Sequence, residues 1–112
     1  MQIPPQYVSD HLPLYLCMER LGVVIEGEFR SLTRQQILAI RLMIKQPGRV
    51  VSFEEFRDLI GNDGGELSRS ALKQLMFRTR QRLAPFGDLI QTARGSGYLL
   101  DPQATMATAE AE

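Results

Sequence analysis

The sequence predicts an α+β fold, in which a small N-terminal antiparallel sheet precedes three helices and a C-terminal β-hairpin. Three observations lead to this prediction. Short apolar and β-branched runs at residues 14–18, 23–25 and 29–32 are typical of strands. Two segments with the spacing of a helix-capping box each begin an amphipathic stretch, and a third such stretch follows. Two further strand-like runs, 89–93 and 98–100, are separated by a glycine-rich turn.

A chain of 112 residues, 44% of them hydrophobic, has room for one folded domain with one core. We expect this domain to span residues 12–101. Residues 1–11 contain Pro4-Pro5 and little periodicity, so we interpret them as an N-terminal arm. Residues 102–112 are mostly alanine, threonine and glutamate without an apolar face, which predicts a disordered tail.

The first two helices are predicted from their starts. Thr33 and Gln36 have the spacing of a capping box, in which each side chain binds a backbone N–H at the helix start. Ser52 and Glu55 repeat this spacing, and Gly61 ends the second helix. The apolar stripes consist of Ile37, Ile40 and Ile44 in the first helix and of Phe53, Phe56, Leu59 and Ile60 in the second.

Ser68 is the expected N-cap of the third helix, which runs to about Ala84, just before Pro85. Helical spacing divides this helix into an apolar inward face and a polar, basic outward face. The inward residues are Leu72, Met76, Thr79 and Leu83. The outward residues are Ser70, Lys73, Gln74, Phe77, Arg78 and Gln81.

The net charge of zero is unevenly distributed along the chain. From Leu67 to Leu100 six basic residues accompany one acidic residue, Asp88, so this segment carries a charge of about +5. Phosphate binding depends on such a local basic face and not on the total charge. Charged helix faces are often merely solvated, however, so charge alone does not decide the function.

The order of the second helix, the third helix and the C-terminal hairpin favours DNA binding. A helix, a turn and a further helix form the arrangement in which the second helix lies in a DNA major groove and the first helix contacts the DNA backbone. The hairpin that follows adds a wing, with Arg94 at its tip and glycines at 95 and 97 that permit a tight turn. Beside such a helix, Arg94 is placed to enter a minor groove; alone, it would be interpreted as an exposed turn arginine.

Three motifs in the chain match one known family. They are Leu32-Thr33, Pro47–Ser52 and, above all, the sequence IQTARGSGY over Ile90–Tyr98. They closely resemble the OmpR/PhoB-type winged-helix domain of response regulators, and the resemblance covers about residues 14–100. It implies a four-stranded N-terminal sheet, three helices and a C-terminal hairpin.

The resemblance also implies roles for individual residues. Arg94 would enter the minor groove, Thr92 would contact a phosphate, and the loop Asn62–Leu67 would be able to touch RNA polymerase. The outward residues of the third helix that would face the major groove are Ser70, Lys73, Gln74 and Arg78.

The sequence departs from the family in three ways. Too few residues precede Leu14 to build the phosphorylatable receiver domain that the family usually carries, so control by phosphorylation within this chain is not expected. Phe77 stands where a basic residue is common, and Thr79 stands where leucine is usual. Phe77 is compatible with contact to a thymine methyl group and equally with packing against a neighbouring protomer.

The favoured function is sequence-specific binding of double-stranded DNA for transcriptional regulation. Lysine and arginine donate to guanine and glutamine pairs with adenine, so base readout is assigned to Lys73, Gln74 and Arg78. Phosphate contacts are assigned to Arg69, Arg80 and Arg82. Pairing of two copies is expected only on adjacent DNA half-sites.

The alternative function is a protein-interaction module that keeps the same scaffold. It would use Leu75, Phe77 and the acidic neighbours to bind another regulator or RNA polymerase. Salt dependence separates the two hypotheses, because counterion release weakens DNA binding steeply with salt while an apolar contact changes little.

Other classes of function lack the residues they need. The lone His11 and the lone Cys17 provide neither a metal site nor an internal disulfide, and no nucleophile–base pair can be assembled, so no enzyme activity or cofactor is expected. Ser52 and Glu55 are explained by helix capping. There is no membrane-spanning run and no signal peptide, so we expect a cytoplasmic protein.

Overall fold

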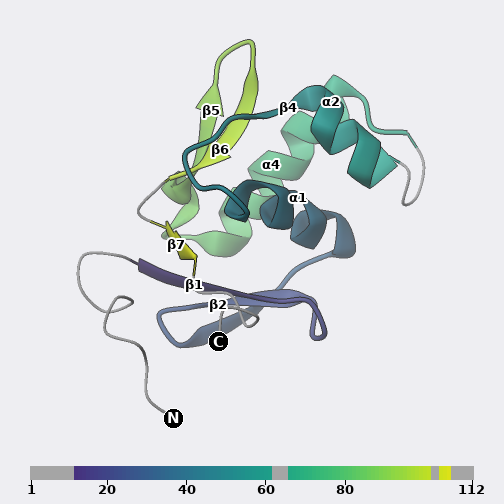
Figure 1. Cartoon of the computed structure of the whole chain (residues 1–112). Coiled ribbons are helices and arrows are strands. Elements are labelled where there is room, and N and C mark those ends of the chain that lie inside the picture. Colours follow the sequence, from purple (N-terminus) through teal and green to yellow (C-terminus); the bar gives the residue numbers. More distant parts are fainter. Residues whose placement is uncertain (1–11, 62–65, 102–103, 107–112) are drawn as a thin grey trace.

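The computed structural model describes residues 12–61, 66–101 and 104–106, and it has the predicted α+β architecture. A meander of three strands leads into a central helix, and further helices and a hairpin follow (Figure 1). The elements are β1 (Leu12–Cys17), β2 (Gly22–Ile25), β3 (Glu28–Ser31), α1 (Arg34–Ile44), β4 (Val51–Ser52), α2 (Phe53–Phe56), η2 (Arg57–Gly61), α4 (Arg69–Leu83), η3 (Gly87–Leu89), β5 (Ile90–Ala93), β6 (Gly97–Leu100) and β7 (Ala104–Met106).

The first sheet has the strand order β3-β2-β1-β7. The β1–β2 and β2–β3 pairs are antiparallel. Between β2 and β3 the chain turns through Glu26 and Gly27, whose φ angles of 53° and 81° are both positive. Such turns match the twist of the strands they connect, which confirms the predicted tight hairpin at this position.

Strand β7 corrects two predictions. The sequence predicts a disordered tail over residues 102–112, but Ala104–Met106 forms a strand parallel to β1, with Leu12 opposite Ala104. The first sheet is therefore mixed and not purely antiparallel, and its fourth strand comes from the C-terminal side. Pairing at a sheet edge uses backbone groups, so it needs no apolar side-chain pattern. Residues 102–103 and 107–112, and the arm over 1–11, lie outside the described residues.

The second sheet contains the C-terminal hairpin. Its order is β4-β6-β5, with Thr92 opposite Tyr98 in the hairpin and Val51 opposite Tyr98 on the other side. The two-residue strand β4 is too short to give a sequence signal and was not predicted. A Cβ atom at Gly97 would lie 2.8 Å from the carbonyl carbon of Val51, so β4 can approach β6 this closely only at a glycine.

Both predicted capping boxes are present. The Thr33 hydroxyl accepts the Gln36 N–H at 3.2 Å, and the Gln36 side-chain oxygen accepts the Thr33 N–H at 2.9 Å. Ser52 and Glu55 repeat the arrangement at the start of α2, at 3.2 and 3.1 Å. The second helix differs from the prediction only in its later part, which continues from α2 as the π-helical turn η2.

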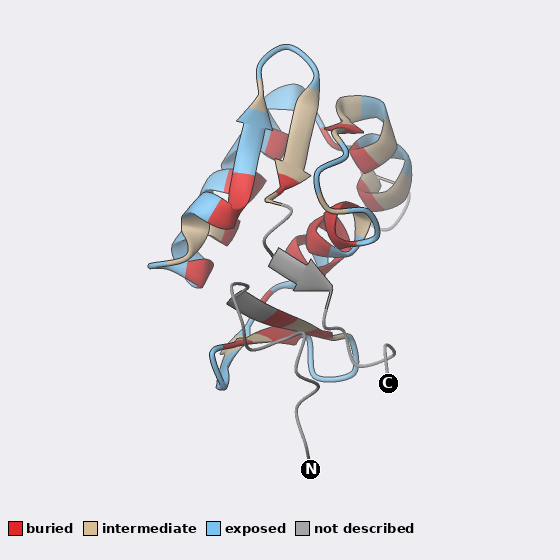
Figure 2. Ribbon diagram, turned by 60° about the vertical axis from the view of Figure 1, so that its left-hand side comes forward, coloured by how far each residue is buried: buried red, intermediate tan, exposed pale blue. Residues whose placement is uncertain are grey.

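The core lies between the first sheet and the helices and extends to the base of the hairpin (Figure 2). Helix α1 is buried along most of its length because its stripe of isoleucines is broadened by neighbouring apolar residues. The largest fully buried side chains include Leu14, Ile25, Ile37, Ile40, Met43, Phe56, Ile60, Met76, Leu83, Ile90 and Leu100. Figure 1 shows the first sheet at one end of the molecule and the β5–β6 hairpin projecting at the other.

Two arginines join the first sheet to the C-terminal end of α4. Arg30 on β3 donates from Nη1 to the carbonyl oxygens of Arg82, at 3.1 Å, and of Ala84. Arg82 donates in return to the carbonyl oxygen of Ser31 at 2.9 Å. The last carbonyls of a helix have no acceptor role within the helix and carry its negative dipole end, so a guanidinium is a suitable partner. These bonds fix the direction in which α4 crosses the sheet.

Candidate nucleic-acid interface

The third predicted helix is observed as α4, with Ser68 as its N-cap. Its predicted inward residues Leu72, Met76, Thr79 and Leu83 are all buried. Thr79 fits in the core because its hydroxyl donates to the carbonyl oxygen of Leu75 at 2.7 Å. The six predicted outward residues are all exposed, which confirms the division of the helix into two faces.

The exposed side of α4 consists of three rows of side chains, defined by spacings of three, four and seven residues. The middle row, which we call the crest, is uncharged, and each flanking row is basic. The crest consists of Ser70, Gln74, Phe77 and Gln81. The row on the wing side consists of Arg69, Lys73 and Arg80, and the row on the α1 side of Arg78 and Arg82.

A cleft of about 150 Å³ lies between the hairpin and the N-terminal half of α4, where Arg69 and Lys73 line it. Among the residues that the structure describes, none of those lining it is acidic. Its polar and basic lining comes from Arg69 and Lys73 on α4 and from Thr92 and Ser96 on the hairpin. We call it the wing cleft. It offers cationic and hydroxyl donors from two sides to one anionic group.

Arg80 connects α4 with the hairpin. Its Nε donates to the carbonyl oxygen of Ile90 at 2.9 Å, and its Nη2 donates to the Thr92 hydroxyl oxygen at 2.8 Å. Its guanidinium also lies 5.9 Å from the centre of the Tyr98 ring. Arg80 thus holds the hairpin against α4, and the Thr92 hydroxyl proton is left to donate elsewhere.

Arg94 is exposed and lies in the turn that joins β5 to β6, which is the tip of the hairpin. The tip is closed by the N–H of Ser96, which donates to the carbonyl oxygen of Ala93 at 2.8 Å. Gly95 has a φ of 75°, a conformation that side chains with a Cβ atom rarely adopt. The backbone of the tip therefore positions Arg94, whose side chain makes no hydrogen bond or ion pair with the described residues.

The N-terminal end of α4 is held by α2. The Arg69 guanidinium lies 4.4 Å from the centre of the Phe53 ring and 3.7 Å from a carboxylate oxygen of Glu54. The Arg69 side chain is nevertheless 74% exposed. It can therefore rotate toward an outside anion at little cost, because exposed ion pairs contribute little to stability.

Arg49 and Glu55 stabilise the start of α2. Arg49 Nη2 lies 2.7 Å from Glu55 Oε1. The hydrogen bond from Arg49, followed by that from the Ser52 N–H, lowers the pKa of Glu55 to about 2. The same pair raises the pKa of Arg49 above its ordinary value. The carboxylate is thus held ionised between the Ser52 N–H and the Arg49 guanidinium.

The α1-side row borders a second cleft with a larger volume of about 650 Å³, which we call the α1 cleft. One wall is the junction between β3 and α1, and the other is the C-terminal half of α4. Arg78 makes no hydrogen bond or ion pair with the part of the chain that the structure describes. The described lining residues are Ser31, Leu32, Thr33, Gln36, Arg78, Gln81 and Arg82.

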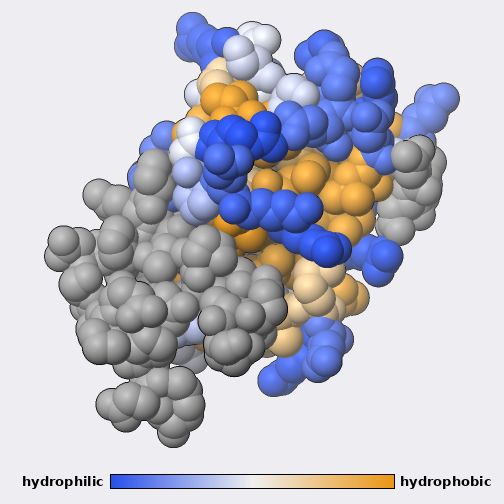
Figure 3. Space-filling view, viewed as in Figure 1, coloured by the Kyte–Doolittle hydropathy of each residue, from blue (hydrophilic) through white to orange (hydrophobic). Residues whose placement is uncertain are grey.

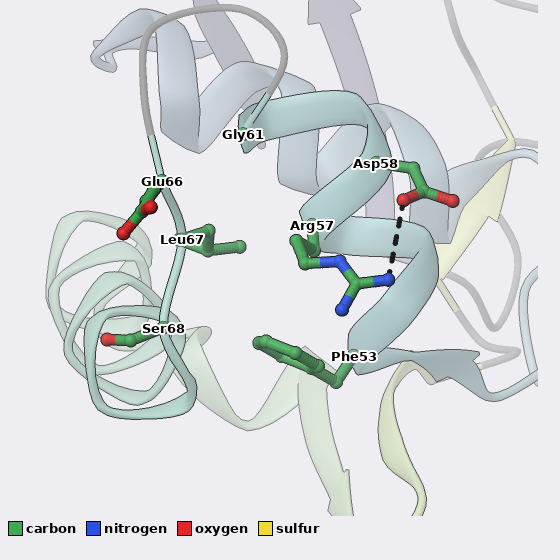
Figure 4. Close-up of a pocket in the computed structure, with 7 residues that line it drawn as sticks. All are labelled: Phe53, Arg57, Asp58, Gly61, Glu66, Leu67 and Ser68. Atoms are coloured by element: carbon green, nitrogen blue, oxygen red, sulfur yellow. Dashed lines mark ion pairs between the residues drawn. The ribbon is translucent and has the colours of Figure 1, made fainter.

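The loop expected to contact RNA polymerase, Asn62–Leu67, is described only from Glu66 onward. Glu66 is exposed and Leu67 is buried. Figure 4 shows Leu67 pointing toward Arg57 on η2, across a cavity of about 570 Å³ that also borders Phe53. Arg57 lies 3.7 Å from Asp58 on the same turn. Four residues of the predicted contact loop, 62–65, lie outside the described residues.

The described residues provide no group of three or more metal-ligating side chains. None of the helices in the described ranges is long and apolar enough to cross a membrane. In the view of Figure 3, hydrophilic side chains border an apolar area on this face of the molecule.

Comparison with known families gives a specific match. The family described as "Transcriptional regulatory protein, C terminal" matches residues 27–100, which include α1, α4 and the wing. A comparison with curated proteins gives no significant match.

Three solved structures that share the fold over most of this chain show what it is similar to. The AdeR DNA-binding domain, solved in complex with an intercistronic region, is 22% identical with a TM-score of 0.69, over 79% of this chain and 93% of that chain. The C-terminal domain of the nisin resistance regulator NsrR is 25% identical with a TM-score of 0.67, over 79% and 91%. The CpxR DNA-binding domain from E. coli is 24% identical with a TM-score of 0.66, over 86% and 97%. The chain therefore belongs to the family of C-terminal domains of transcriptional regulatory proteins and is a winged-helix DNA-binding domain of the OmpR/PhoB type.

Proposed function

We propose that the chain binds duplex DNA sequence-specifically, with α4 in a major groove and the β5–β6 wing in the adjacent minor groove. The observation that carries this proposal is the wing cleft. A helix in one groove and a wing in the next enclose the single sugar-phosphate strand that separates the two grooves. The cleft between α4 and the wing has the basic and hydroxyl lining that this strand requires, from Lys73, Arg69, Thr92 and Ser96.

Base readout is proposed for side chains of the crest and of the two rows beside it. Lys73 and Arg78 donate to guanine and Gln74 pairs with adenine, while Ser70 accepts or donates. Phe77, which is 55% exposed, is proposed to contact thymine methyl groups. Arg94 is proposed to enter a narrow, A·T-rich minor groove, where the negative potential is enhanced.

Phosphate contacts are proposed for Thr92 and Arg69 at the wing cleft. Arg80 is proposed to act on the same strand mainly through Thr92, because its guanidinium is already bound to β5. Arg82 remains a candidate phosphate contact through the part of its guanidinium that does not bind Ser31. All these contacts are sequence-independent and fix the register of the domain on the duplex.

The proposal extends to partners and to location. RNA polymerase is a proposed partner of the loop Asn62–Leu67, and a second copy is a proposed partner on an adjacent half-site. The activity is proposed to be non-enzymatic regulation in the cytoplasm of a bacterium, where the DNA is accessible.

A protein-interaction module is a second candidate, supported by the exposure of Phe77 in the middle of the crest. The structure supports this protein-interaction hypothesis less well than the sequence alone does. Leu75, which that hypothesis also needs, is 9% exposed and belongs to the core. One exposed aromatic residue is common on protein surfaces and does not define an interface.

The proposal is tested by selecting duplexes from a random library and measuring isotherms at several salt concentrations for Lys73→Ala, Arg80→Ala and Phe77→Ala. Lys45→Ala is the control, because it removes an exposed lysine at the C-terminal end of α1. Lys73→Ala should relax the preference at one base pair. Arg80→Ala should weaken all sequences alike, and it should lower the salt slope, which is the slope of the logarithm of the affinity against the logarithm of the salt concentration, by at most about 1. Phe77→Ala should leave the slope intact and alter a thymine preference or the pairing of two copies.

The protein-interaction hypothesis predicts the opposite result. Duplex binding would be weak for every variant and insensitive to Lys73 and Arg80, and only the Phe77→Ala variant would lose a protein partner. Isotherms of that kind would refute DNA binding as the function while leaving the fold unchanged.

A further inference from the structure

The α1 cleft has the composition of an anion site. It is lined by Arg78 and Arg82, by the amide side chains of Gln36 and Gln81, and by the hydroxyl group of Thr33. No acidic side chain lines it among the described residues. Two positive charges without a countercharge, together with several hydrogen-bond donors, favour a ligand that is negatively charged and rich in acceptor oxygens.

The start of α1 adds to this preference. The cleft contains the N-cap Thr33 of an eleven-residue helix, whose N-terminal dipole favours negative charge. Thr33 and Gln36 satisfy each other's backbone N–H groups through the capping box. The N–H of Gln35, at the second helical position, has no acceptor within the helix.

The Gln36 side chain provides an independent indication of a ligand. Gln36 is only 6% exposed, and it is one of two buried polar residues in the part of the chain that the structure describes. Its Oε1 accepts the Thr33 N–H, but its Nε2 has no partner among the described residues. Leaving a buried amide donor unsatisfied is costly, so such groups usually have a bound partner. Gln36 lines the α1 cleft, from which that partner would come.

The position of the cleft points to the source of the ligand. Arg69 and Lys73 of the wing-side row line the wing cleft, and Arg78 and Arg82 line the α1 cleft. A helix in the major groove, which is roughly 12 Å wide, has the phosphates of one strand on each side. If the wing cleft receives the strand next to the minor groove, the α1-side row faces the other strand.

We propose that the α1 cleft is a phosphate site, and that it seats a backbone phosphate of the DNA strand opposite the one held at the wing cleft. Gln36 Nε2, the free part of the Arg82 guanidinium and Arg78 donate to this phosphate. The domain thereby contacts phosphates of both DNA strands that border the major groove. The source of the phosphate rests on the proposed DNA binding; the phosphate chemistry of the cleft does not.

Three Gln→Glu variants test the site. Gln36→Glu keeps the capping box, because glutamate accepts the same N–H, but it replaces the donor with a negative charge. Gln81→Glu changes an exposed lining residue, which cannot disturb the core. Gln35→Glu is the matched control, since it adds the same charge one residue away on an exposed side chain outside the cleft. Thermal denaturation verifies that each variant is folded.

The first measurement uses a duplex from the selection above. We expect Gln36→Glu and Gln81→Glu each to lose about tenfold in affinity and to lower the salt slope by about 1, against about twofold for Gln35→Glu. Duplexes with single neutral methylphosphonate linkages locate the contact. One position on the strand opposite the wing should weaken the wild type, and at that position Gln36→Glu should cause no further loss.

The second measurement uses inorganic phosphate and no DNA. In a nuclear magnetic resonance titration against chloride at equal ionic strength, phosphate should shift the Gln36 side-chain amide and the Gln35 backbone N–H. If phosphate shifts these signals but the three variants bind DNA equally, the site takes a free phosphate compound and the DNA source is wrong. The proposed DNA binding fails separately, if the wild type binds no duplex. If the three variants bind DNA equally and phosphate shifts neither the Gln36 side-chain amide nor the Gln35 backbone N–H, the proposed phosphate site is wrong.

Discussion

The Arg94 side chain makes no hydrogen bond or ion pair with the residues that the structure describes, so its truncation should leave the fold intact. We expect Arg94→Ala to weaken duplex binding by roughly 1–3 kcal/mol, with the largest loss where the wing faces an A·T-rich minor groove. Isotherms on A·T-rich and G·C-rich flanks measure this difference. Unchanged affinity on both, with an unaltered circular dichroism spectrum, would refute the wing assignment.

Gly97 controls the wing from its base. An added Cβ would collide with the carbonyl oxygen of Val51 and approach its carbonyl carbon to 2.8 Å. We expect Gly97→Ala to lower the free energy of unfolding by about 2–4 kcal/mol, because β4 and β6 must separate. Gly95→Ala is the control: its Cβ meets nothing within 4 Å, so only its φ of 75° opposes the change, at about 1–2 kcal/mol. Denaturant unfolding distinguishes the two, and equal losses would mean that the β4–β6 contact is unimportant.

The arginines of α4 show what a sequence leaves open at the residue scale. Their exposure on one side of a helix was predictable from spacing, and it is confirmed. Their partners were not, because the Arg80 guanidinium binds a strand ten or more residues later and Arg82 binds Ser31, 51 residues earlier. Charge and periodicity do not encode such distant contacts. Arg30 was not singled out at all, since a lone arginine in a strand carries no signal.

The start of α2 gives a prediction at the scale of an element. The pKa of Glu55 is lowered to about 2 from an ordinary value of 4.5, so the folded state binds this proton less readily than the unfolded chain. Its contribution to stability is therefore complete above about pH 4.5 and is lost as the pH falls toward 2. Glu55→Gln keeps the capping box and should reduce the loss of stability over this range.

Denaturant unfolding from pH 2 to pH 6 measures the effect. The control is Glu54→Gln, which changes the exposed neighbour on the same helix and leaves the Arg49–Glu55 pair in place. Both side chains of that pair are about 40% exposed, so screening by solvent keeps the effect small. Identical pH profiles for the wild type and Glu55→Gln would show that the pair does not stabilise the fold.

Elements with local signals were predicted and elements with non-local causes were not. The capping boxes, the hairpin turn at Glu26 and Gly27, and the wing follow from short motifs whose chemistry acts within a few residues. Strands β4 and β7 contain two and three residues, and each exists because it pairs with a distant strand. The π-helical end of the second helix likewise has no distinct pattern, because the same apolar spacing describes an α-helix.

At the scale of the whole molecule, the apolar stripes of all three helices are used within one core. The chain should therefore be mainly monomeric without DNA and should pair only on half-sites about 10–11 base pairs apart, one helical turn. Analytical ultracentrifugation with and without a duplex carrying two such sites tests this, and a duplex with half a turn added between them is the control. A stable dimer at micromolar concentration without DNA would reveal an interface elsewhere.

The pairing of β1 with β7 has a kinetic consequence. Leu12 and Ala104 are opposite each other, so this contact closes a loop of nearly the whole chain, whereas β1–β2 and β5–β6 join neighbours in sequence. Contacts between distant residues form late, because the chain loses more entropy in closing the larger loop. We expect β7 to dock last and to detach first. Its amides should exchange with deuterium fastest among the strands, while α4 and the wing remain protected after β7 has opened.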